Sequence, residues 1–232
     1  DGDALALAAG ELVRVLAKGR CVQPDPLQQR QRPGFALAVV GALVTACHDR
    51  GVDFVYCISP GLTVRYSGDD DFQALLRRYA DVAALGVRRV GLLLDDIPGS
   101  LQHDADRAEF GGLIEAQAHL IERVRAALPP GTELMICPTR YFGYGDEPEI
   151  TAFGRAVADD VVITFTGRQI CSTTIDLDDA RCFEDAPAHR PVYWDNYPVN
   201  DVAMTGQLHI GPYRGRSADL GDGADGVIAN VM

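Results

Sequence analysis

The chain has 232 residues, of which 47% are hydrophobic, and its 21 basic and 33 acidic side chains give a formal net charge of −12. This length and composition suit a single globular domain with a sizeable core and exclude an intrinsically disordered chain. The acidic balance argues against nucleic acid as a partner, because phosphate binding requires a basic surface, and the absence of a long apolar run argues against a membrane partner.

Neither the cysteines nor the first residues identify a compartment. The six cysteines are widely spaced and form no CxxC pair, so the sequence contains no zinc or redox motif. The chain begins at Asp1 and shows no signal peptide, so we expect a processed protein or a fragment that is soluble and either cytoplasmic or secreted.

The first 34 residues contain no clear strand pattern. The Ala/Leu/Val-rich segment Ala4–Lys18 is predicted to be helical, and the Gln/Arg/Pro-rich segment Cys21–Gly34 to be a loop or a poorly ordered connector. We therefore divide the chain into a divergent N-terminal segment, residues 1–34, and a partial barrel that forms the catalytic domain, residues 35–232.

From Phe35 onward, predicted helices and strands alternate. The expected helices cover Phe35–Arg50, Asp69–Leu85, Asp106–Leu128, Glu147–Val157 and Asp178–Glu184. The expected strands cover Val52–Ile58, Val87–Leu94, Glu133–Cys137, Val161–Thr166, Pro191–Asn196 and Gly226–Val231. These strands are continuous apolar runs, which are typical of a parallel sheet buried on both faces. The alternation predicts a (β/α) barrel or a doubly wound sheet.

Polar residues at the carboxyl ends of the predicted strands favour the barrel, because a TIM barrel builds its active site from those ends. The residues at these ends are Ser59, Asp95, Asp96, Tyr141, Thr166, Asn196 and Asn230. A closed barrel of this class needs eight strands, and only six are recognisable. We therefore expect an α/β fold, a TIM-type (β/α)8 barrel that is incomplete at its N-terminus, with the first two strands not recognisable.

Two adjacent carboxylates, Asp95 and Asp96, follow the apolar run Val90–Leu94. Because adjacent strand residues point to opposite sides, two such side chains can approach one substrate from different directions. Their like charges should also separate their pKa values, which acid–base catalysis requires. A helix N-cap or a pair of metal ligands remains an alternative interpretation of the same two residues.

A second cluster, from Trp194 to Asp201, places aromatic, amide and carboxylate side chains directly after a predicted strand. Aromatic rings stack on the apolar face of a sugar, and Asn and Asp side chains bind hydroxyl groups through directional hydrogen bonds. A simple core role for Trp194 is the alternative, although the density of polar side chains around it favours a binding site.

Six segments, in this order, resemble successive motifs of glycoside hydrolase family 84: Val52–Leu62, Leu93–Ile97, Cys137–Tyr141, Phe165–Gly167, Trp194–Asp201 and Gly226–Asn230. The resemblance covers roughly Phe35 to Met232. It implies a retaining β-N-acetylglucosaminidase of the O-GlcNAcase type, in a family that also includes proteins called hyaluronidases. The implied partner is a glycan or glycoprotein that contains N-acetylglucosamine, and no metal or cofactor is required.

The resemblance also implies a substrate-assisted mechanism, in which the 2-acetamido group of the sugar forms an oxazoline intermediate. By the family pattern, Asp95 would hold and polarise the acetamido N–H. Asp96 would protonate the departing glycosidic oxygen and then deprotonate water. Tyr141 would donate a hydrogen bond beside the reacting centre.

Further substrate-binding positions follow from the same resemblance. Cys137 would line the floor near the acetyl methyl group, and Trp194 would pack against the N-acetyl group. Thr166 and Ile170 would form a wall of the pocket. Plain core packing is the alternative for Cys137 and Ile170.

Three polar residues complete the implied site. Asn196 would orient the carboxylates or the acetamido group, and Asp201 and Asn230 would bind sugar hydroxyls. Two other hypotheses stay open: a sugar-binding remnant without turnover, and a metal-dependent enzyme that uses Asp95 and Asp96 as ligands. The second has no support from a phosphate-binding loop or a histidine cluster.

The sequence departs from the family pattern near its start. It lacks the Gly-Phe-Tyr-Gly-like motif and the Pro-Lys-Asp-Asp-like motif that end the family's first two strands, and Lys18 is not assigned the family's lysine role. Phe165 stands where the family usually has Trp. A partial gene product explains these departures better than an unfamiliar barrel closure, and exposed strand edges would allow self-association.

Overall fold

The computed structural model describes residues 14–20, 33–197, 199, 206 and 214–230, with the side chains of these from residue 37 onward. The strands are β1 (Arg14–Arg20), β2 (Asp53–Ser59), β3 (Arg89–Leu93), β4 (Glu133–Cys137), β5 (Val162–Phe165), β6 (Val192–Asp195) and β7 (Gly226–Ala229). The helices are α1 (Pro33–His48), α2 (Asp69–Ala83), α3 (Asp104–Glu109), α4 (Leu113–Ala127), α5 (Pro148–Ala156), α6 (Leu177–Asp185) and the short 3₁₀ helix η2 (Leu220–Asp222).

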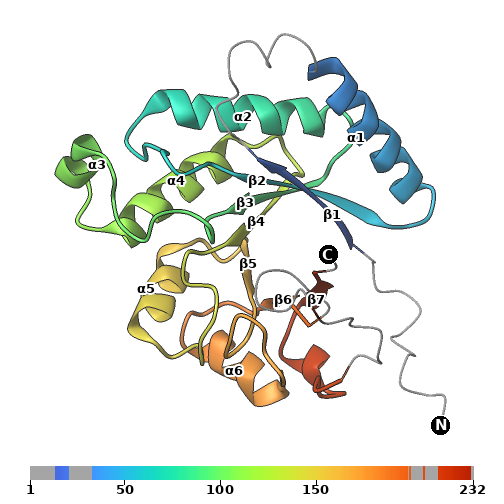
Figure 1. The fold of residues 1–232 in the computed structure, drawn as a ribbon, viewed down its shortest axis with the longest axis vertical. Helices are drawn as coiled ribbons and strands as arrows, with labels where there is room; N and C mark the ends of the chain where they lie inside the picture. The colour runs from blue at the N-terminus through green and yellow to red at the C-terminus, as the bar shows by residue number, and fades with distance from the viewer. Residues whose placement is uncertain (1–13, 21–32, 198, 200–205, 207–213, 231–232) are drawn as a thin grey trace.

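Within these residues, the strands form one parallel sheet in which each strand pairs with the next in chain order, from β1 to β7. Figure 1 shows the sheet curling while helices α1, α2, α4, α5 and α6 follow one another around its outer side. A parallel sheet with a helix in each crossover is the architecture of a (β/α) barrel. The structure confirms the predicted fold, a partial barrel with β1 and β7 at its two edges.

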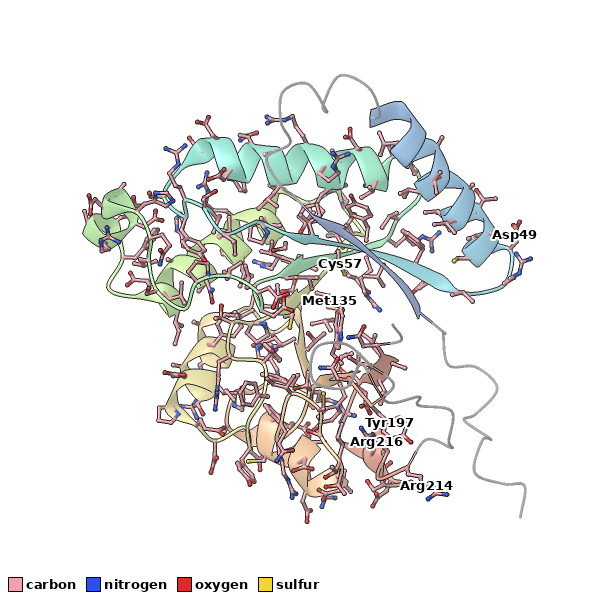
Figure 2. All side chains as sticks on the ribbon, in the orientation of Figure 1. Asp49, Cys57, Met135, Tyr197, Arg214 and Arg216 are labelled. Carbon is pink, nitrogen blue, oxygen red and sulfur yellow. The ribbon has the colours of Figure 1, made fainter. Side chains whose placement is uncertain are left out.

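The two faces of the sheet bury different sets of apolar side chains. On the outer face, Leu92 and Leu94 belong to a large core cluster shared with the helices, whereas on the inner face Leu93 packs with Cys57 and Met135. Figure 2 labels Cys57 and Met135 near the middle of the sheet. A Cβ atom on Gly91 would lie 2.4 Å from the Cys57 Sγ, so only glycine lets the inner side chains of β2 and β4 pack across β3.

The prediction of a helix over Ala4–Lys18 is wrong for its described part, because residues 14–20 form strand β1. This strand pairs with β2 along its whole length, from Arg14 beside Asp53 to Arg20 beside Ser59. The open edge of β2 supplies hydrogen-bond partners that outweigh local helical composition. The first 50 residues thus contain a strand, and Lys18 lies in it, while residues 4–13 of the predicted segment lie outside the described residues.

The loop predicted over Cys21–Gly34 falls mostly on residues 21–32, which lie outside the described residues, and Pro33 and Gly34 begin α1. The boundary at residue 34 stays a prediction, although β1 joins the sheet from the N-terminal side of it.

The long helix predicted over Asp106–Leu128 is divided into α3 and α4. Phe110 is extended, with φ −113° and ψ 141°, and Gly112 is also extended. The Asp106 carboxylate draws α3 toward the loop after β2 by accepting hydrogen bonds from the backbone N–H groups of Tyr66 (3.2 Å) and Ser67 (2.8 Å). These tertiary bonds fix the break at a point where two glycines weaken the helix.

The remaining helices and strands lie close to their predicted bounds, and local sequence explains their ends. Helix α2 begins with Asp69, Asp70 and Asp71, whose charges favour the positive end of the helix dipole. Gly86 follows it with φ +94°, a conformation that favours glycine. None of the helices in the described parts of the chain is both long and apolar enough to span a bilayer.

Candidate active site

The carboxylate pair lies where the chain leaves β3. Leu94 hydrogen bonds to β4 through its backbone N–H, which donates to the Cys137 carbonyl at 2.8 Å, and Asp95 and Asp96 form the turn that follows. Asp95 is half-buried and Asp96 is exposed. Among the described residues, no group of three or more His, Cys, Asp or Glu side chains is arranged to hold a metal ion.

Tyr141, in the loop after β4, lies within electrostatic reach of both carboxylates. Burial raises the pKa of its phenol above the usual value, and the charges of Asp95, Cys137 and Asp96 raise it further. Cys171, from the loop after β5, also raises the pKa of Tyr141. The structure therefore places Asp95, Asp96, Cys137 and Cys171 close enough to Tyr141 for their charges to act on its phenol.

A chain of neutral hydrogen bonds links the carboxyl ends of β6 and β7. The Asn230 side-chain N–H donates to the Asn196 side-chain oxygen at 2.8 Å, and the Asn196 side-chain N–H donates to the Ile170 carbonyl at 2.8 Å. The Asn230 backbone N–H also donates to the Asp195 carbonyl at 2.9 Å. Each amide group keeps a second N–H, so the pair can still donate to a hydroxyl group.

The loop after β5 holds the two residues predicted to form a pocket wall. The Thr166 backbone N–H donates to the Tyr141 carbonyl at 2.9 Å, and its hydroxyl donates to the Gln169 carbonyl at 2.8 Å. Thr166 is buried, so its hydroxyl stabilises the loop. The Ile170 side chain is 47% exposed, which argues against plain core packing for this residue.

Trp194 and Cys137 lie on the inner face of the sheet. Both are buried in the inner cluster with Leu93 and Ile228, and Tyr141 packs against that cluster. They therefore have a core role and also lie below the loop that carries Tyr141. The remaining predicted site residue, Asp201, lies outside the described residues.

A buried ion pair at the end of β6 was not predicted from the sequence. Asp195 is 1% exposed and the Arg216 side chain 7%, and the guanidinium binds the carboxylate through both Nε and a terminal nitrogen. Arg216 also donates to the carbonyls of Ser172 (3.0 Å) and Thr173 (3.1 Å), while the Tyr197 backbone N–H donates to Asp195 at 2.9 Å. Figure 2 shows Tyr197 and Arg216 side by side.

This ion pair attaches the loop after β5 and the segment before η2 to the strand that carries Trp194 and Asn196. A structural role for Asp195 could have been predicted, because its carboxylate lies within an aromatic and polar cluster of the sequence. Nothing in the sequence pairs it with Arg216, which lies 21 residues away.

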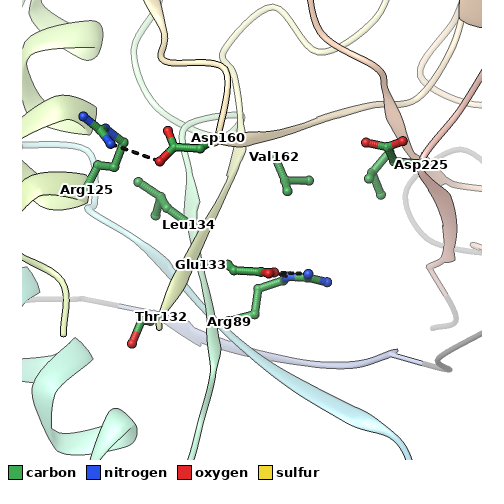
Figure 3. Close-up of a pocket in the computed structure, with 9 residues that line it drawn as sticks. Arg89, Arg125, Thr132, Glu133, Leu134, Asp160, Val162 and Asp225 are labelled. Carbon is green, nitrogen blue, oxygen red and sulfur yellow. Dashed lines mark hydrogen bonds and ion pairs between the residues drawn. The ribbon is translucent and has the colours of Figure 1, made fainter. Parts of the chain in front are cut away.

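A hollow of about 480 Å³ lies at the opposite end of the sheet (Figure 3). It is lined by residues from the starts of strands and from neighbouring loops, namely Arg89, Arg125, Thr132, Glu133, Leu134, Asp160, Val162, Val192 and Asp225. The side chains of Arg89 and Glu133 form an ion pair there, and Arg125 contacts Asp160 at 3.0 Å. Because Asp95, Tyr141 and Asn196 follow the carboxyl ends of their strands, this hollow is separate from the carboxylate pair.

Comparisons with known proteins identify a family for this chain. A family model described as beta-N-acetylglucosaminidase matches residues 30–232. The chain is 28% identical over 194 residues to the protein O-GlcNAcase of Rattus norvegicus and to that of Mus musculus, a match that covers 81% of this chain and 21% of each relative. The chain thus spans about a fifth of the length of these curated relatives.

Two solved structures are also similar. A mutant O-GlcNAc hydrolase from Thermobaculum terrenum superimposes with a TM-score of 0.81 at 28% identity, over 87% of this chain and 44% of that one. The protein CpGH84B has a TM-score of 0.76 at 23% identity, over 94% of this chain and 39% of its own, which supports the fold alone. With a family model that matches almost all of the predicted barrel, the chain belongs to the β-N-acetylglucosaminidases of glycoside hydrolase family 84.

Proposed function

We propose that this chain is the catalytic barrel of an enzyme that hydrolyses terminal β-linked N-acetylglucosamine from O-GlcNAc-modified proteins or from glycans. The observation that carries the proposal is the convergence of Asp95, Asp96 and Tyr141 at the carboxyl end of the sheet, in a chain of this family. The Asn196–Asn230 amide pair belongs to the same end and offers hydrogen bonds of the kind that bind sugar hydroxyls.

The proposed reaction retains the anomeric configuration. The carbonyl oxygen of the 2-acetamido group attacks the anomeric carbon as the glycosidic C–O bond breaks, and an oxazoline forms. Asp95 accepts a hydrogen bond from the acetamido N–H and stabilises the positive charge that develops on this group. Asp96 gives its proton to the departing glycosidic oxygen. In the second step Asp96 takes a proton from water, which attacks the anomeric carbon and opens the oxazoline.

The residues around the pair would bind the sugar. Tyr141 would donate a hydrogen bond next to the reacting centre, since a phenol is protonated at neutral pH and burial raises the pKa of this one further. Cys137 and Trp194 would form the apolar floor under the acetyl methyl group, and Thr166 and Ile170 the neighbouring wall.

The polar side of the pocket would contain three residues. Asn230 and Asp201 would bind hydroxyl groups, and Asn196 would orient the acetamido group or the carboxylates. The ion pair of Asp195 and Arg216 would hold this side in place, because it connects the loop after β5 and the segment before η2 to the end of β6.

Hydrolysis of 4-nitrophenyl N-acetyl-β-glucosaminide tests the proposal directly. We expect turnover by the parent chain and a loss of about 100- to 10,000-fold in the Asp96→Asn variant, because general acid–base catalysis contributes that much. Asp104→Asn is the matched control, since the Asp104 side chain is 99% exposed on α3, and it should keep full activity. Full activity in Asp96→Asn would contradict the assigned role.

A second candidate is a protein that binds N-acetylglucosamine without turnover. The observation in its favour is that the described residues supply seven strands, so the sheet has edges at β1 and β7 where a closed barrel has none. Tight binding of an oxazoline mimic by a folded parent that hydrolyses no aryl glycoside at any pH would support this candidate over the enzyme.

A further inference from the structure

A partly buried hydrogen-bond network holds the peptide bond that leads into Asp95. The Thr139 hydroxyl donates to the Leu94 carbonyl at 2.7 Å, and this carbonyl belongs to the peptide that joins Leu94 to Asp95. The Leu94 backbone N–H donates to the Cys137 carbonyl at 2.8 Å. Both backbone polar groups of Leu94 are therefore bound, the N–H by the last residue of β4 and the carbonyl by Thr139 in the segment that leads toward Tyr141.

Gln117, on α4, fixes the direction of these bonds. Its side-chain N–H donates to the Thr139 oxygen at 2.8 Å and lies 3.5 Å from the Tyr66 hydroxyl. Since a hydroxyl has one proton, a Thr139 oxygen that accepts from Gln117 is left to donate to the Leu94 carbonyl. Gln117 is 2% exposed and Tyr66 is 3% exposed, so water does not compete for these groups.

The network lies behind the candidate site, on the helical side of the sheet. Leu94 and Tyr66 belong to the outer core cluster, whereas the inner cluster contains Cys137 and contacts Tyr141. Thr139 is thus the link between the buried outer layer and the two segments that carry the reacting groups. Because Tyr141 is only two residues from Thr139, one hydroxyl ties the Asp95 peptide to the segment that carries Tyr141.

We infer that Thr139 and Gln117 are positioning residues, which set the orientation of the Asp95–Asp96 pair relative to Tyr141. The inference rests on the proposed function. It adds to the site two residues to which the resemblance assigns no role. Its physical basis is that a displacement of about 1 Å of a catalytic group can lower a rate about 100-fold. Neither residue needs to touch the sugar.

The test compares Thr139→Val, which removes the hydroxyl at nearly constant volume, with Thr139→Ser, which keeps it. Thr164→Val is the control, because the hydroxyl of the buried Thr164 likewise donates to a backbone carbonyl of the neighbouring strand, that of Ile136, at 3.1 Å. Both valine variants should lower Tm by a few degrees. Only Thr139→Val should lower kcat, by about 10- to 100-fold with KM changed less than about threefold, and Thr139→Ser should recover most of the loss.

Gln117→Met gives a second measurement on the same network. It removes the donor to Thr139 and leaves the hydroxyl in place, so we expect a smaller decrease in kcat, about three- to tenfold. If Thr139→Val and Thr164→Val lose stability equally and both keep the parent kcat, the network has a purely structural role and the inference is wrong.

An activity-independent readout separates this inference from the proposed function. Burial and the charge of Asp95 raise the pKa of the Tyr141 phenol. The experiment follows the titration of this phenol by NMR in tyrosine-labelled protein. In Thr139→Val this pKa should move toward the ordinary value, whereas in Thr164→Val it should stay. A parent without turnover would overturn the proposed function, while an unchanged Tyr141 titration in Thr139→Val would overturn the positioning role.

Discussion

At the amino end of the sheet, ion pairs line a hollow, whereas the carboxyl end carries a pair of carboxylates together with hydrogen-bonded amide and hydroxyl side chains. Glu133 binds Arg89 and Asp160 binds Arg125 around the hollow at the amino end. At the other end the Asp95–Asp96 pair has Tyr141 as a neighbour, and both carboxylates raise its pKa.

The difference shows where each kind of interaction is useful. Neutralised pairs contribute modestly to stability and leave little charge to act on a ligand. Carboxylates set among neutral donors keep a charge that a reaction can use, and the price is like-charge repulsion at the site. Exceptions at the carboxyl end include the pair of Arg168 and Asp179 and the buried pair of Asp195 and Arg216, which holds the loops there.

The largest change in stability should follow from breaking the ion pair of Asp195 and Arg216. Arg216→Met leaves the buried Asp195 carboxylate without its cation, and we expect a loss of about 3–5 kcal/mol in the free energy of unfolding, measured with urea. Activity should fall as well, since the loops after β5 and before η2 lose their anchor. The double variant Asp195→Leu/Arg216→Met should recover part of the stability, and a double variant less stable than Arg216→Met would contradict this account.

The strands and the carboxylate pair were predictable because their signals are local. The runs before Asp95 and at Glu133–Cys137 are continuously apolar and end at turn residues, as buried parallel strands do. Cys137 and Trp194 illustrate the limit, because the inner cluster gives them a core role that coexists with a position under the proposed pocket.

What the sequence did not predict depends on contacts between distant segments. Strand β1 forms against the edge of β2. Its seven residues include charged side chains and show no alternation of polar and apolar residues that would predict a strand. The break between α3 and α4 depends on Asp106 and Ser67, 39 residues apart, and Gln117 contacts Thr139 over 22 residues. Such pairs become visible only when the sheet brings their loops together.

A smaller effect, dependent on pH, is expected at Asp106, which joins two loops at the carboxyl end. Burial alone would raise the pKa of this carboxylate, but hydrogen bonds from Ser67 and Tyr66 lower it below the usual value. Its stabilising contribution is therefore present above the unfolded pKa of about 4 and is lost as pH falls through the lower folded pKa. Asp106→Asn should cost about 1.5–3 kcal/mol at pH 7, because bonds to a charged group are lost.

The matching measurement is urea unfolding of the parent and Asp106→Asn at pH 7 and at progressively lower pH. The difference in the free energy of unfolding between parent and variant should shrink in acid, because protonation removes the charge of Asp106 from the parent and the variant has no such charge. Asp104→Asn, on the same helix but exposed, should run parallel to the parent at each pH. If the stability difference for Asp106→Asn stays constant across the whole pH range, the charge of Asp106 contributes nothing to its bonds with Tyr66 and Ser67.

The smallest effect is expected at the amino end, where Glu133→Gln tests whether the two ends are independent. The Arg89 side chain is 10% exposed and the Glu133 side chain 57%, and glutamine keeps an oxygen that can accept from the guanidinium. We expect a loss of about 0.5–1 kcal/mol, reduced further by salt, because one partner is in contact with solvent. Hydrolysis of the aryl glycoside should stay within about twofold of the parent, since the altered charge lies at the far end of β4 from Tyr141. A tenfold loss of kcat would show that the paired charges at the amino end also set the geometry of the carboxylates, and the division between the two ends would fail.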